Sequence, residues 1–328
     1  MIPSSSAPET APESAPPSDA DRGSSQTETE TRKTHFRFDG LFWRRLGYLG
    51  ATRGPVWWQR IGPAIVAGIV FLVARENRRG AVANLRAILG SKSWLRDHLR
   101  ALKLFTEFAY CTTDVWQYDA AHDASDLERE LEIITPPEVD LDQILADERG
   151  LVVITSHFGT WEVGARVLKR FGRRVNLVMS RETNPSVEEF QRTWREHYGL
   201  NVIRSDLSPF SSMNMIRALR RGEVVAIQLD RAVGNQVTRD IDFFGRPAPF
   251  LYGPFVLARL AGVPIWPVFV ARLRRGSYRF LPEPPRSIPR GASEAETLAV
   301  MRDVVQCFER RVREHPYQWF QFRPLWRD

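Results

Sequence analysis

The stretch Leu151-Val-Val-Ile-Thr-Ser-His157-Phe-Gly-Thr-Trp-Glu162 joins a short apolar run, rich in β-branched residues, to a histidine, a glycine and a carboxylate. Such a run, bounded by polar residues, predicts a buried strand. Gly159 or Thr160 can cap the helix that follows, which we expect to end near Phe171. His157 therefore lies where a strand ends and a helix begins, a common place for chemistry in α/β folds.

Glu162 falls in the first turn of that predicted helix, where its carboxylate can point back at the imidazole of His157. A carboxylate on one ring nitrogen holds the tautomer that leaves the other nitrogen able to accept a proton. This spacing is typical of a general base that activates a hydroxyl. It is also frequent by chance, since most histidines after a strand are simply solvated or satisfied by ordinary contacts, so the interpretation depends on the rest of the chain.

Further strands alternate with helices downstream. We expect strands at 173–179, 200–203 and 223–229, with helices at 187–198 and 209–221 between them. This rhythm predicts an α/β fold with a mostly parallel central sheet flanked by helices. Ligands of such sheets bind outside the carboxyl ends of the strands, and His157, Arg181, Asp230 and Arg231 all fall at such ends.

The elements on either side of this core are less regular. Upstream, helical spacing runs to a break at Gly90, and a separate helix is expected at 106–118. Downstream, we expect a loop over 241–254 that enters a helix at 255–261. A buried strand at 262–270 with an antiparallel partner at 278–281 follows, and then a long amphipathic helix at 292–314.

The N-terminal part of the chain divides in two by composition. Residues 1–34 are rich in Ser, Pro, Thr and Glu and predict a disordered tail. Residues 35–75 combine Trp and Arg with an uncharged run of 14 residues, Ile61–Ala74, which is shorter than the ~20 residues of a full membrane span. We expect a membrane-associating helical segment that dips into one leaflet with Trp57 and Trp58 at the headgroups; the alternative is a buried core helix. Residues 76–328 then form the main domain.

Charge narrows the classes of partner. The chain carries a net charge of +7, and its basic residues are mostly Arg, which suits phosphate-bearing partners such as nucleic acid, anionic lipid or a phosphopantetheine carrier. Trp beside Arg favours an anionic membrane surface, and no nucleic-acid motif is present. The histidines and the two cysteines, Cys111 and Cys307, show no metal-ligand spacing, and no glycine-rich phosphate loop follows a strand.

The order of the motifs resembles the late acyltransferases of lipid A biosynthesis, within the lysophospholipid acyltransferase superfamily. The resemblance covers about residues 40–327. It is carried by His157-Phe-Gly-Thr-Trp-Glu162, Arg181-x-x-Asn184-Pro185, Asp230 at a strand end, Asp242-Phe-Phe-Gly-x-Pro-Ala248, a Gly-Pro-entered helix, and Pro316-Tyr-Gln-Trp-Phe320.

The resemblance implies roles for individual residues. The catalytic pair would be His157 and Glu162. Substrate-binding residues would be Gly159, Trp161, Arg181, Asn184, Asp230, Arg231, Phe243 and Gly245. The last two belong to a block beside the acyl tunnel. Arg231 stands where the family often has Gln, which bears on the acceptor and not on the chemistry. No metal and no cofactor is implied apart from an acyl donor carried on acyl carrier protein or CoA.

The predicted reaction moves a fatty acyl chain from such a thioester to a hydroxyl or amine of a membrane (glyco)lipid, for example a lipid A precursor, at the cytoplasmic face of the inner membrane. We expect no acyl-enzyme, because Ser156 and His157 point to opposite faces of the strand. Arg181 and Arg231 can hold phosphates or form surface ion pairs, and Asp230 can belong to the site or only anchor Arg181. The alternative function is a non-catalytic membrane-surface lipid-binding protein.

Overall fold

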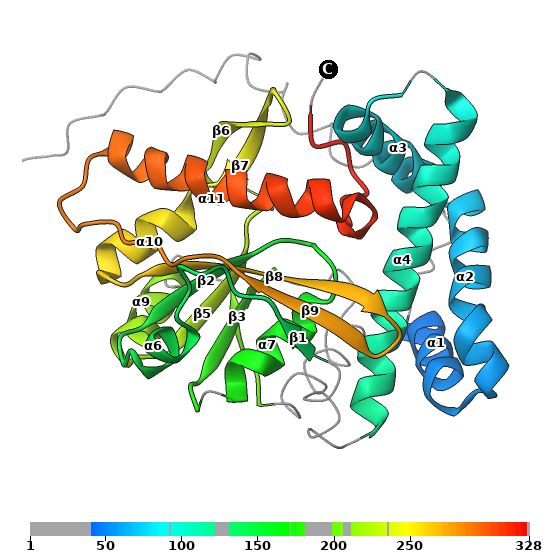
Figure 1. Cartoon of the computed structure of the whole chain (residues 1–328), viewed down its shortest axis with the longest axis horizontal. Helices are drawn as coiled ribbons and strands as arrows, with labels where there is room; N and C mark the ends of the chain where they lie inside the picture. Colours follow the sequence, from blue (N-terminus) through cyan, green and yellow to red (C-terminus); the bar gives the residue numbers. More distant parts are fainter. Residues whose placement is uncertain are drawn as a thin grey trace, which may run out of the picture. The chain divides into compact units, whose positions relative to one another are not determined.

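The structure is a computed structural model that describes residues 41–91, 93–121, 131–170, 172–180, 199–205, 211–234 and 236–326 (Figure 1). Residues 38–328 form one compact unit. The predicted tail 1–34 and the predicted helix 187–198 lie outside the described residues, so both stay predictions.

A seven-stranded sheet with the order β1-β9-β8-β2-β5-β3-β4 forms the centre of this unit. The strands from β8 through β2, β5 and β3 to β4 are parallel, while β8 and β9 pair antiparallel and β1 pairs parallel with β9. The strands are β1 (Leu131–Ile133), β2 (Leu151–Thr155), β3 (Val175–Met179), β4 (Asn201–Arg204), β5 (Val224–Gln228), β8 (Ile265–Arg274) and β9 (Ser277–Pro282). The predicted α/β fold with a mostly parallel sheet is confirmed, as is the antiparallel partner of the 262–270 strand.

Helices cover both faces of this sheet (Figure 1). α9 (Ser211–Arg220), α10 (Gly253–Ala261) and α11 (Glu294–Glu314) share one apolar core with Val152 and Ile154 of β2. Leu151 and Val153 of the same strand point the other way, toward the core that α6 (Leu141–Ala146) and α7 (Trp161–Arg170) share. Both faces of β2 are buried, and therefore its sequence is a continuous apolar run instead of an alternating one.

Four helices precede the sheet: α1 (Leu41–Arg53), α2 (Val56–Val73), α3 (Arg75–Leu89) and α4 (Trp94–Ala121). α2, α3 and α4 share a third apolar core, which Phe320 of the C-terminal segment also enters. Arg272 at the end of β8 forms an ion pair of 2.7 Å with Asp114 of α4, which fastens these helices to the sheet. The boundary that we predicted between residues 75 and 76 stays a prediction.

α4 differs from the sequence expectation, which had a separate helix starting at Thr106. The structure has one helix of 28 residues. The Thr106 hydroxyl donates to the carbonyl of Leu102 within that helix, at 2.9 Å, instead of capping a new one. A threonine inside a helix makes this bond to the carbonyl four residues back, so its presence does not mark a helix start.

The predicted loop over 241–254 is also wrong. It contains an antiparallel hairpin of β6 (Thr238–Phe243) and β7 (Arg246–Leu251). The two turn residues, Phe244 and Gly245, have φ of 56° and 75°, as a tight two-residue hairpin requires. Proline generally disfavours a strand, but a two-stranded hairpin tolerates Pro247 and Pro249 where no ladder hydrogen bond is needed.

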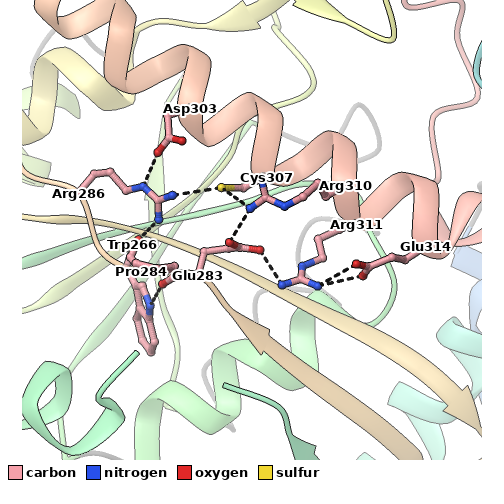
Figure 2. A network of polar contacts seen from close by, with 9 residues as sticks. All are labelled: Trp266, Glu283, Pro284, Arg286, Asp303, Cys307, Arg310, Arg311 and Glu314. Carbon is pink, nitrogen blue, oxygen red and sulfur yellow. Dashed lines mark hydrogen bonds and ion pairs between the residues drawn. The ribbon is translucent and has the colours of Figure 1, made fainter. Parts of the chain in front are cut away.

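α11 is fastened to the sheet by a network of charged side chains (Figure 2). Glu283, which follows β9 and is 3% exposed, pairs with Arg310 at 2.9 Å and with Arg311 at 2.6 Å. Arg286 pairs with Asp303 at 2.6 Å and also reaches Cys307 Sγ at 3.3 Å. Burial, with the charge of Glu283, raises the pKa of the Cys307 thiol. These contacts set the position of α11 along the sheet.

Candidate active site

His157 lies directly after β2, at the carboxyl end of the sheet, as the sequence predicts. Its ring Nδ1 is 2.9 Å from Oδ1 of Asp230, and its backbone N–H donates to the same oxygen at 3.0 Å. Asp230 follows β5, the strand paired with β2, so the parallel register brings the two residues together. Since the carboxylate engages Nδ1, the proton is held there and Nε2 is left as the basic nitrogen.

Asp230 is held from behind by the C-terminal segment. The indole N–H of Trp319 donates to its Oδ2 at 3.0 Å, and the Gln321 side chain donates to its backbone carbonyl at 3.2 Å. Asp230 is only 1% exposed. Burial by itself raises its pKa, but the charge and hydrogen bonds of His157, together with the charge of Arg231, hold that pKa below its ordinary value. The group therefore stays ionised, and it both orients the ring and stabilises its protonated form.

The loop after His157 packs closely against β8 and the C-terminal segment. Gly159 has φ of 52°, and a Cβ there would lie 1.9 Å from the carbonyl oxygen of Val270. Its N–H donates to Gln318 O at 2.8 Å, and the N–H of Thr160 donates to Val270 O at 3.0 Å. Only glycine fits this close approach between the loop, β8 and the C-terminal segment.

A cavity of about 380 Å³ opens beside the His157 ring. Its lining includes four predicted site residues besides His157, namely Gly159, Trp161, Glu162 and Arg231. α4 lines its other wall with Phe108, Cys111, Thr112, Val115 and Trp116. The sequence prediction had placed chemistry at the strand ends alone, so the contribution of α4 comes from the tertiary structure.

Several buried polar atoms near this cavity lack a hydrogen-bond partner among the described residues. They include Nε2 of Gln228, Nε of Arg231 and Oγ1 of Thr160, all on residues that line it. Buried donors without a partner are rare in proteins, so these atoms are available to a ligand that enters the cavity. Burial also lowers the pKa of the Arg231 guanidinium. Its Nη2 donates to Phe320 O at 3.2 Å, which aims the rest of the group along the cavity wall.

The structure arranges the predicted residues unequally. Asp230 contacts Nδ1 of His157, the position that the sequence interpretation gave to Glu162. Glu162 lies in the wall of the same cavity, and its catalytic role stays a prediction. Arg181 and Asn184 lie outside the described residues. Ser156 is fully buried and does not line the cavity.

The hairpin residues Phe243 and Gly245 do not line the cavity beside His157. Phe243 is fully buried, with its ring 5.5 Å from that of Trp319 and stacked on Phe308 at 5.2 Å. Gly245 is exposed at the hairpin turn. Phe243 therefore supports the indole that holds Asp230, while substrate binding by either residue stays a prediction.

Sequence reasoning did not single out three positions that contact or line this site. Trp319 was noted only within the motif Pro316-Tyr-Gln-Trp-Phe320 and Gln321 was given no role, because nothing local shows that this segment returns to β5. Gln228 was taken only as part of the predicted strand at 223–229. A polar residue ending an otherwise apolar strand, two positions before Asp230, was the available signal.

Two comparisons with known proteins bear on this site. The family model of the bacterial lipid A biosynthesis acyltransferases matches residues 51–328, most of the chain, so the chain belongs to this family of acyltransferases. It is also 28% identical over 184 residues to the lipid A biosynthesis lauroyltransferase of Escherichia coli (strain K12). That match covers 55% of this chain, which spans 58% of the length of that relative.

Proposed function

We propose that this protein transfers a fatty acyl chain from an acyl thioester to a hydroxyl or amine of a membrane (glyco)lipid, such as a lipid A precursor. The observation that carries the proposal is the His157–Asp230 pair, oriented by Trp319, in the wall of a cavity that also holds unpartnered donors. Membership of the family and the name of the E. coli relative support lipid A, or a similar glycolipid, as the acceptor class.

In the proposed reaction, Nε2 of His157 takes the proton of the acceptor hydroxyl or amine while the oxygen or nitrogen attacks the thioester carbonyl carbon. The tetrahedral intermediate then expels the thiolate as the carbon–sulfur bond breaks, and the imidazolium proton passes to the sulfur. Asp230 stabilises the imidazolium between the two steps. General-base assistance of this kind contributes about two to four orders of magnitude in rate.

The negative charge that develops on the carbonyl oxygen needs donors. The N–H groups of Gly159 and Thr160 are already used by Gln318 and Val270, so they are unsuited to this role. Gln228 Nε2 is a buried donor in the cavity wall without a described partner, and it is suited to the oxyanion or to the acceptor headgroup. Arg231, with Arg181, would hold a phosphate of the acceptor or the phosphopantetheine of the donor.

Glu162 is the second proposed catalytic group, as the resemblance implies. Its place in the cavity wall supports contact with substrate. The matched variants Glu162→Gln and Asp230→Asn separate the two carboxylates. Loss of turnover in both would make Glu162 a reacting group beside the His157–Asp230 pair, whereas near-normal turnover in Glu162→Gln would remove it from the mechanism.

We propose that the protein acts at the cytoplasmic face of the inner membrane. α2 is apolar and long enough to cross a membrane, though a single helix of this kind is weak support, and only 17% of it is buried. Trp57, Ile65 and Leu72 are among its exposed apolar side chains. Replacing these three with Ser or Gln should release the protein from anionic vesicles in a sedimentation assay. Unchanged sedimentation would reject the role of α2.

Lipid mass spectrometry of cells with and without the protein tests the acceptor and the transferred chain together. A lipid species that gains one acyl group only in the presence of active protein supports the proposal. Purified protein supplied with acyl-CoA or acyl carrier protein thioester then distinguishes the two donors. If cells with the His157→Ala variant behave like cells with the wild type, and neither the variant nor the wild type forms an acylated product, the non-catalytic lipid-binding alternative is favoured.

A further inference from the structure

A second cavity lies among the N-terminal helices, outside the sheet. It has a volume of about 460 Å³, within the range of about 300–1,000 Å³ for small-molecule sites. Its lining comes from α1, α2 and α4 and is mostly apolar, including Trp58, Pro63, Val66, Val70, Phe105 and Ala109. The polar lining residues are Arg44, Gln59, Thr112 and Thr113. A cavity with so large an apolar share of its lining suits a hydrocarbon chain better than a headgroup.

The two cavities are neighbours. Arg44, Phe108, Thr112 and Trp116 line both the helical cavity and the cavity beside His157. A mostly apolar compartment therefore adjoins the cavity beside His157, with Arg44 lining both. A molecule that extends through both would have its polar end near His157 and its apolar end between α2 and α4.

The helical cavity also borders the outer apolar face of α2. Val66 and Ile69 line it, yet they are 46% and 48% exposed, and Leu46 of α1 is similarly exposed. On the same helix, Leu72 is 70% exposed and does not line the cavity. On this side, α2 therefore separates the cavity from the protein surface. The outer, apolar face of α2 is suited to contact with lipid.

Two tryptophans shape the cavity. A Cβ at Gly62 would lie 2.7 Å from the ring of Trp58, and a Cβ at Gly47 would lie 3.0 Å from the ring of Trp116. Glycine at these helix positions lets each indole lie directly against the helix backbone. Packing against the backbone restricts the position of each indole. The two rings therefore form fixed parts of the cavity wall and do not fill the cavity.

From these observations we infer that the helical cavity binds one hydrocarbon chain of a membrane lipid, the acceptor of the reaction, which enters past α2 and presents its headgroup to His157. This inference rests on the proposed function for the identity of the acceptor, but chain binding itself does not require turnover. The acyl chain of the thioester donor is the competing occupant.

Photo-crosslinking of the full-length protein tests the inference directly. The probe is phosphatidylglycerol with a diazirine in one acyl chain, presented in vesicles, and a parallel sample receives diazirine-labelled palmitoyl-CoA. We expect the phospholipid to label cavity-lining residues of α2 and α4 when peptides are mapped by mass spectrometry. Labelling of the cavity by the acyl-CoA but not by the phospholipid, or phospholipid label confined to the outer residue Leu72, overturns the inference.

A matched pair of substitutions tests whether the labelling depends on the cavity. Ala109→Phe fills the cavity from α4, whereas Ala83→Phe makes the same change at an exposed position on α3. Ala109→Phe should lower cavity labelling by about tenfold, as expected when at least two methylenes lose their apolar contact, and Ala83→Phe should not. If Ala109→Phe fails to fold, Val70→Phe narrows the same cavity from α2. Equal labelling in the filled and control variants overturns the inference.

Failure of this inference can be told apart from failure of the proposed function. Cavity labelling by the phospholipid without any acylated product would leave chain binding intact and remove the enzymatic proposal. Acyl transfer by the wild type, unaffected in rate and in acceptor preference by Ala109→Phe, would keep the enzymatic proposal and remove the cavity from it.

Discussion

Two carboxylates in this protein are buried almost equally and have different surroundings. Asp230 is 1% exposed and Glu283 is 3% exposed. Asp230 contacts the imidazole of His157, a side chain suited to general-base chemistry, whereas Glu283 contacts the guanidinium groups of Arg310 and Arg311. A cavity lies beside the first pair, and the second lies between α11 and the sheet (Figure 2).

The difference shows why burial of a charge does not by itself identify an active site. Both carboxylates are satisfied by opposite charges, so both are tolerated in the interior. Only the Asp230 pair has a partner that can gain and lose a proton next to a space for substrate. We therefore expect changes at Asp230 and His157 to affect turnover, and changes at Glu283 to affect stability.

His157→Ala tests the first half of this difference most strongly. We expect acyl transfer to fall by about 10²- to 10⁴-fold, because the general base is lost. The melting temperature should change little, since the side chain is partly exposed at a cavity wall. Steady-state transfer of a radiolabelled acyl chain measures the first quantity and circular dichroism the second. Near-normal turnover would exclude His157 as the base.

Glu283→Ala tests the second half. It leaves Arg311, which is largely buried, without its carboxylate, and loss of one partner of a buried pair costs about 3–5 kcal/mol in the free energy of unfolding. Turnover per folded molecule should stay near that of the wild type. Asp303→Asn is the matched control on the same face of α11, where the half-exposed pair with Arg286 contributes about 0–1 kcal/mol. Equal stability losses in both variants would contradict the distinction.

Asp230→Asn keeps the shape of the site and removes its charge. We expect transfer to fall by about 10²- to 10⁴-fold, as for His157→Ala, because the ring remains but its tautomer and its protonated form are no longer favoured. The acceptor KM should change less than kcat. A variant with unchanged kcat and a raised KM would make Asp230 a binding residue.

Gln228→Leu removes one buried donor while keeping similar volume. We expect turnover to fall by about 10- to 100-fold, the effect of losing one hydrogen bond to a charged oxygen. The fold should be retained or slightly stabilised, since the amide has no described partner in the unliganded protein. Thr155, which pairs with Gln228 across the parallel strands, offers a control through Thr155→Val. An equal loss of turnover in Thr155→Val would point to a general disturbance of the strand ends.

The smallest expected effect is on the pH dependence of stability. The pKa of Asp230 is lowered in the folded protein, so its contribution is present above the ordinary pKa of Asp, about 3.9, and is lost as pH falls through the folded value. Asp230→Asn should therefore show a shallower loss of unfolding free energy between pH 5 and pH 3 than the wild type. Urea unfolding at several pH values measures the slope, and equal slopes would show that Asp230 is not the group responsible.

Much of the fold was predictable from local patterns. Apolar runs of five or so residues separated by helices indicated the parallel sheet, and three of the predicted site residues, His157, Asp230 and Arg231, lie at adjacent strand ends as expected. The failures have local causes too. The prolines of β7 made the β6–β7 hairpin hard to predict, and Thr106 was taken for a helix start although it lies inside α4.

The sequence by itself indicated the candidate histidine and its place after a buried strand, because the apolar run and the helix signals that follow it are short-range properties of the chain. Only the tertiary structure decided which carboxylate contacts the ring, and that Trp319 and α4 complete the site. Those contacts join residues 73 and 89 positions apart, and no periodicity reports on pairings at such distances. The helical cavity likewise exists only where α1, α2 and α4 pack together, since it is a property of the space between helices and not of any one of them.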